Sequence, residues 1–179
     1  MDDLEYWLKG SVPEIPLLLQ PVAHALLQVQ KELKEVFIDF DEKKLWERPK
    51  NVASVGFHVN HLTGVLDRLF TYAKGEGLSP EQLVFLKNEG IENIHTNSTE
   101  LLKVFDLQVI KSLGQLKATN SETLTEPRFV GRKMLPSTVI GLLFHAAEHT
   151  QRHLGQLPVT SAIVCDNRPG HAPSRRQQL

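Results

Sequence analysis

Three histidines spaced four residues apart are the part of this sequence that could do metal chemistry. His145, His149 and His153 lie in the segment HAAEHTQRHLGQ, and the whole chain of 179 residues has only eight histidines. Two imidazoles at positions i and i+4 of an α-helix can reach one ion, because they differ by about 40° around the axis and about 6 Å along it. Neutral imidazole is a common ligand of zinc and related divalent ions near pH 7. The alternative is a solvated polar edge of a helix.

The apolar residues around these histidines favour the last two as ligands. The expected inward face of this helix consists of Val139, Leu143, Ala146, Ala147, Thr150, Leu154 and Leu157. His149 and His153 flank that face, whereas His145 lies furthest outward and about 12 Å along the axis from His153. We therefore expect His149 and His153 to bind one ion together. His145 is expected at the surface, or beside the site as a hydrogen-bonding partner.

The segment FHVNHL offers two possible sources of a third ligand, His58 and His61. The inward face of this second segment is marked by Val55, Val59, Leu62, Leu66 and Leu69. His58 lies nearer that face, so an argument from burial favours His58. A reactive metal also needs access to solvent, which favours a residue on the flank. Periodicity alone therefore leaves the choice open.

Amphipathic segments elsewhere in the chain are long enough to form the helices that position these residues. Apolar residues at three- and four-residue spacing predict long helices over residues 16–37, 54–75, 98–117 and from about 136 to 157 or beyond Pro158. Ser54 or Asn51 is the expected N-cap of the second, and Gly75 its stop. Ser79 and Pro80 predict the start of a short helix within residues 76–90.

Four long helices and almost no strand alternation predict an all-α fold, an up-and-down four-helix bundle. Residues 119–135 show no periodicity, so we expect a long loop there. The length suits one domain, over residues 1–165, followed by a flexible C-terminal tail over 166–179.

Composition and charge exclude several classes of protein. The chain is 41% hydrophobic and 23% charged, which is typical of a folded globular protein. The formal net charge of −1 gives no electrostatic reason to expect a nucleic-acid partner. No apolar run approaches the ~20 residues that span a bilayer, and the N-terminus does not resemble a secretory signal. With a single cysteine, Cys165, a cytoplasmic protein without a membrane partner is expected.

The two histidine segments together resemble the DinB/YfiT-like family, four-helix proteins regarded as metalloenzymes. SVGFHVNHLTGVLDRLFTYAKG resembles the family's second helix, and HTQRHLGQL resembles its closing H-x-x-x-H-x-G-Q pattern. The resemblance extends over nearly the whole chain to about residue 160. It implies a DinB/YfiT-like bundle with His61, His149 and His153 as the metal ligands.

Other residues near these segments receive weaker assignments. Gly155 and Gln156 belong to the matched pattern, where Gly155 is expected to let a neighbouring helix approach closely and Gln156 to lie at a pocket. His58 is not required by the pattern, and neither is His145; each is expected either to hold an imidazole or water beside the ion or to have no metal role.

Arg68 and Tyr72 lie on the His61 side of the second helix and are expected to line a pocket. Glu148 points away from the histidines on the helical wheel, so no catalytic acid or base is identified. Trp46 is expected to anchor the link between the first two long helices.

Three nitrogen ligands leave a coordination position open, which is the arrangement of a catalytic site. The resemblance implies a divalent metal that activates water or a low-molecular-weight thiol co-substrate against a small-molecule substrate. The general preferences of nitrogen sites favour zinc or nickel as that metal. The expected enzyme is a metal-dependent transferase or hydrolase. The alternative is a non-catalytic, stress-related or interaction bundle with an empty metal site. A homodimer is expected under either interpretation.

Overall fold

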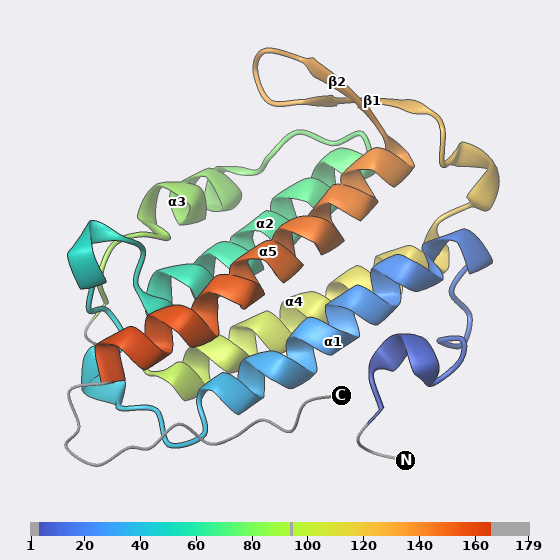
Figure 1. The fold of residues 1–179 in the computed structure, drawn as a ribbon. Helices are drawn as coiled ribbons and strands as arrows, with labels where there is room; N and C mark the ends of the chain where they lie inside the picture. Colours follow the sequence, from blue (N-terminus) through green and yellow to red (C-terminus); the bar gives the residue numbers. More distant parts are fainter. Residues whose placement is uncertain (1–3, 94, 166–179) are drawn as a thin grey trace.

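Four long α-helices lie side by side in the part of the chain that the computed structural model describes, residues 4–93 and 95–165 (Figure 1). They are α1 (Gln20–Val36), α2 (Val55–Ala73), α4 (Ser98–Ala118) and α5 (Val139–Cys165). A short helix, α3 (Pro80–Asn88), lies against α2. The expected all-α class is confirmed. The predicted C-terminal tail, residues 166–179, lies outside the described residues.

Side chains at the helix starts explain why these segments become helical where they do. The Ser54 hydroxyl accepts a hydrogen bond from the Phe57 backbone N–H at 3.1 Å, so Ser54 is the N-cap of α2. Ser79 and Gln82 form a reciprocal capping box at the start of α3. At the end of α2, Gly75 adopts a φ of +81°, a conformation that glycine accepts at low cost.

The core lies between the inward faces of the four long helices. Leu26, Leu62, Phe105 and Leu143, one from each helix, are completely buried. All seven residues expected on the inward face of the last helix are buried, as predicted. Along the described residues, no helix is both long and apolar enough to cross a membrane.

The directions of the helices differ from the expected up-and-down order. Lys111 of α4 pairs with Asp67 of α2, and Gln115 of α4 donates to the Phe70 carbonyl of α2. Because later residues of α4 contact later residues of α2, these two helices run in the same direction (Figure 1). The physical reason is the connection over residues 74–97, which contains α3 and returns the chain to the end of the bundle where α2 begins.

The prediction of an irregular loop over residues 119–135 was wrong in part. Strands β1 (Pro127–Val130) and β2 (Leu135–Thr138) pair as an antiparallel hairpin, with Pro127 opposite Thr138. Pro136, expected near the start of the last helix, lies in β2, and α5 begins at Val139. Strands of four residues are too short to show clear alternation, so periodicity did not reveal them.

Candidate metal centre

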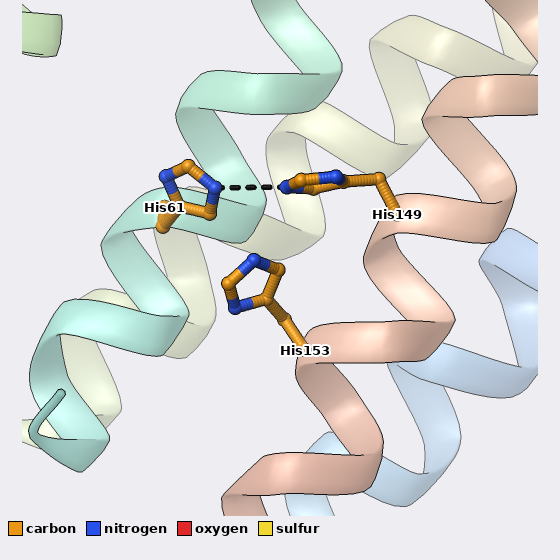
Figure 2. A group of neighbouring side chains, drawn as sticks. All are labelled: His61, His149 and His153. Carbon is orange, nitrogen blue, oxygen red and sulfur yellow. Dashed lines mark hydrogen bonds between the residues drawn. The ribbon is translucent and has the colours of Figure 1, made fainter. Parts of the chain in front are cut away.

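The antiparallel packing of α2 against α5 brings the two histidine segments together. His61 Nε2 lies 2.9 Å from His149 Nε2. One imidazole nitrogen from each of His61, His149 and His153 can be chosen so that all three lie within 4.8 Å of one another. Figure 2 shows the three rings converging from α2 and α5 on a common point. All three side chains are partly buried, which leaves the cluster within reach of solvent.

The donor set and its spacing fit a divalent ion. Zinc–nitrogen bonds of about 2.0–2.1 Å in a tetrahedral site place ligand nitrogens about 3.3 Å apart. In the cluster one pair of nitrogens is 2.9 Å apart and no pair exceeds 4.8 Å, so the three rings already lie near the arrangement that one ion needs. Neutral imidazole nitrogens are also suitable ligands for zinc and nickel.

Glu89, at the C-terminal end of α3, orients His61. Its Oε1 lies 2.8 Å from His61 Nδ1, and its Oε2 accepts a hydrogen bond from Arg68 Nη1 at 3.1 Å. A proton on His61 Nδ1 therefore donates to the carboxylate, which leaves the Nε2 lone pair directed at the cluster. Burial opposes ionisation of Glu89, but the hydrogen bond from His61 and the charge of Arg68 outweigh it and lower the carboxyl pKa.

The Glu89–Arg68 pair lies against α2 at Gly64. A Cβ atom at Gly64 would lie 2.5 Å from Arg68 Nη1 and 2.8 Å from Glu89 Oε2. Both distances are shorter than real Cβ contacts, so any larger residue would displace the pair. The absence of a side chain at Gly64 is thus what admits the carboxylate to its position behind His61.

His58 lies behind His153 and outside the three-histidine cluster. Its Nδ1 is 2.9 Å from His153 Nδ1, and its side chain is buried. Burial, with the nearby His61, lowers the pKa of both His58 and His153 to about 4. Between two neutral rings, one Nδ1 must donate to the other. When His153 donates, its Nε2 lone pair is free to face the cluster.

Burial, followed by the charge of His61, also lowers the pKa of His149. The three histidines His58, His149 and His153 therefore favour the neutral form, which is the form that binds metals.

His145, in contrast, is exposed, and its Nδ1 lies 3.2 Å from Glu148 Oε2. Its ring is a neighbour of His149, with centroids 5.4 Å apart, but it does not belong to the cluster.

A cavity of about 250 Å³ lies directly beside the cluster and is open to solvent. His61, His145 and His149 line it, together with Arg68 and Tyr72, two of the three residues expected at a pocket. Arg68 is buried and paired with Glu89, so its charge stabilises the ionised carboxylate. Gln156 is exposed and does not line this cavity.

Two further expectations concern residues outside the cluster. Gly155 was expected to allow close helix packing, but it is exposed and a Cβ there would meet nothing within 4 Å, so that expectation was wrong. Trp46 packs against the core, and its ring lies 3.0 Å from the position of a Cβ on Gly56 at the start of α2. This contact is what an anchor for the preceding link requires.

Sequence reasoning missed Glu89, which is separated from His61 by 28 positions. The only signal was a carboxylate at the end of a short capped helix, and nothing local shows which side of the bundle that helix covers.

Among comparisons with known proteins, a sequence model of the DinB superfamily matches residues 25–157, a range that includes the whole cluster. No curated protein matches the chain.

Proposed function

Because the chain belongs to the DinB superfamily, we propose that it is a divalent-metal-dependent enzyme whose ion is bound by His61, His149 and His153. The observation that supports this proposal is the convergence of three partly buried imidazoles from two helices beside an open cavity. We expect zinc or nickel, and a reaction of the transferase or hydrolase class on a small molecule.

The residues of the chain have separate tasks in this proposal. Glu89 keeps the His61 ring in the orientation and tautomer that direct Nε2 at the ion, and Arg68 keeps Glu89 ionised. His58 accepts a hydrogen bond from the Nδ1–H group of His153 and so fixes the orientation and tautomer of that ring in the same way. A divalent ion bound there lowers the pKa of a water or thiol ligand and so supplies a nucleophile near neutral pH.

The cavity gives the substrate a place next to the ion. Val65, Leu69 and Tyr72 of α2 line it, as does Val130 of β1. Apolar walls of this kind exclude water from part of the site and favour a small organic substrate over a highly charged one. We propose that the co-substrate is water or a low-molecular-weight thiol.

We propose that this activity is cytoplasmic and that the protein acts as a homodimer without a nucleic-acid partner. A single cysteine suits a reducing compartment, and the near-zero net charge gives no electrostatic attraction to phosphate backbones.

Turnover by the metal-loaded protein tests the enzymatic proposal. Zinc-loaded and nickel-loaded protein would be supplied with a panel of thiols and electrophiles, and with activated esters in the absence of thiol. We expect one of these reactions to be accelerated, and the acceleration to disappear in His61→Ala and after removal of the ion. His95→Ala, which changes an exposed histidine that does not line the cavity, is the matched control and should retain the rate. A metal-loaded protein that accelerates none of these reactions would instead support the non-catalytic alternative.

A further inference from the structure

The cavity beside the histidines adjoins a larger groove. This groove, of about 720 Å³, lies between the end of α2, the connection to α3, α3 itself and the β1–β2 hairpin. Tyr72, Leu78 and Leu86 line both spaces. In Figure 1 the hairpin extends over the end of the bundle, on the side where α2 leads into α3. A molecule with one end at the histidines could therefore extend into the groove without leaving the protein surface.

Large apolar side chains surround the groove and remain exposed. Leu83 and Leu86 of α3 are 46% and 42% exposed, and Phe129 and Met134 of the hairpin are 48% and 60% exposed. All four line the groove. A concave surface that leaves several large apolar side chains in water gains free energy when an apolar ligand covers them.

The charges at the groove are complementary to an anion. Arg128 donates to the Ala73 carbonyl and pairs with Glu126, and Glu76 pairs with Lys74. Arg132, at the hairpin turn, also lines the groove, and within residues 4–93 and 95–165 no hydrogen bond or ion pair occupies its guanidinium. The groove therefore combines an apolar wall with one cation that is available to a ligand.

We propose that the groove binds the apolar body of a small amphipathic organic anion, with the anionic group at Arg132 and the reacting group in the histidine cavity. The position of the reacting group rests on the proposed function. Binding of the apolar body and the anion does not rest on it, because none of the groove residues belongs to the histidine cluster.

Calorimetric titration of metal-free protein with decanoate and with decan-1-ol tests the proposal. A chelator is present throughout, so the carboxylate cannot bind through a metal. We expect saturable binding of decanoate at about one site per chain, weakened about fourfold for each methylene removed from the probe. Arg132→Gln should weaken decanoate about threefold to fivefold and leave decan-1-ol unchanged, as expected for an exposed ion pair.

Two matched controls separate the groove from the general surface. Lys133 follows Arg132 but does not line the groove, so Lys133→Gln should leave decanoate binding unchanged. Leu83→Asp should weaken both probes. Val84→Asp changes the adjacent residue, which is also exposed but is not part of the groove, and should weaken neither.

Several outcomes would overturn the proposal. These are no saturable decanoate binding, equal effects of Arg132→Gln and Lys133→Gln, or equal effects of Leu83→Asp and Val84→Asp. A wild-type dimer that binds no decanoate and becomes monomeric in Leu83→Asp would show that a second copy of the chain covers the groove. Stoichiometric zinc binding without decanoate binding would remove this inference and leave the proposed function intact.

Discussion

At the scale of single residues, Glu89 determines how His61 presents its lone pair. The carboxylate accepts a hydrogen bond from His61 Nδ1 and is itself paired with Arg68, so the His61 ring cannot rotate without losing a partly buried hydrogen bond. Carboxylates in this position behind a ligand imidazole increase its basicity and fix its orientation. A residue that does not contact the ion is therefore expected to control its affinity.

Glu89→Gln is the variant that measures this control. It preserves the size of the side chain and removes its charge, and we expect zinc affinity to fall about tenfold to a hundredfold. Competition with a chromogenic chelator at pH 7 gives the affinity. Glu92→Gln, which changes an exposed carboxylate nearby, is the control and should bind like the wild type. Equal affinities for both variants would exclude a role for Glu89 in positioning His61.

The residues of the cluster were only partly accessible from the sequence. Helical periodicity separated His149 and His153 from His145, because all three lie on one helix and their faces can be compared. It could not choose between His58 and His61, and burial favoured His58, which lies behind His153 instead. The choice of His61 came from the resemblance. Glu89 could not be identified without knowing the path of the chain after α2, which no local pattern predicts.

At the scale of elements, the contact between α2 and the end of α3 places the carboxylate. Gly64 lets the Glu89–Arg68 pair lie directly against α2. The long helices and their starts could be predicted from the spacing of apolar residues and from capping residues such as Ser54 and Ser79. The parallel direction of α2 and α4 could not be predicted, because it depends on contacts between distant segments. The β1–β2 hairpin could not be predicted either, because its four-residue strands are too short to show alternation.

Gly64→Ala and Gly114→Ala form a matched pair that tests this contact. Both glycines lie inside long helices, but a Cβ at Gly114 would meet nothing within 4 Å. Gly114→Ala should stabilise the protein by about 0.5–1 kcal/mol and leave zinc affinity unchanged. Gly64→Ala should not be stabilised in this way, and it should bind zinc about tenfold more weakly, because the new methyl group displaces the carboxylate. Denaturant unfolding and zinc competition measure the two effects. Unchanged zinc affinity in Gly64→Ala would contradict the proposed role of the contact.

At the scale of the whole molecule, the neutral histidines make stability depend on pH. The pKa of His58 and of His153 is about 4 in the folded protein, against 6.5 for an ordinary histidine. Between these values the unfolded chain binds more protons than the folded one, so acid favours unfolding. The stabilising contribution is complete above pH 6.5 and is lost as the pH falls towards 4.

Urea unfolding of the metal-free protein at several pH values checks this dependence. We expect the free energy of unfolding to decrease steadily from pH 6.5 to pH 4. In His58→Gln the slope should correspond to about one proton fewer taken up on unfolding. A stability that does not change over this range, or an unchanged slope in His58→Gln, would show that these rings are not buried in the neutral form.

We propose that the bundle as a whole brings together one three-histidine metal site. The most direct test is the zinc content of protein prepared without a polyhistidine tag, equilibrated with zinc and then freed of loosely bound ions by gel filtration. We predict about one zinc per chain for the wild type and for His145→Ala, as expected for a site with three protein ligands. Zinc should be nearly absent from folded His61→Ala, His149→Ala and His153→Ala. A wild type without zinc, or three variants that retain it, would contradict the claim.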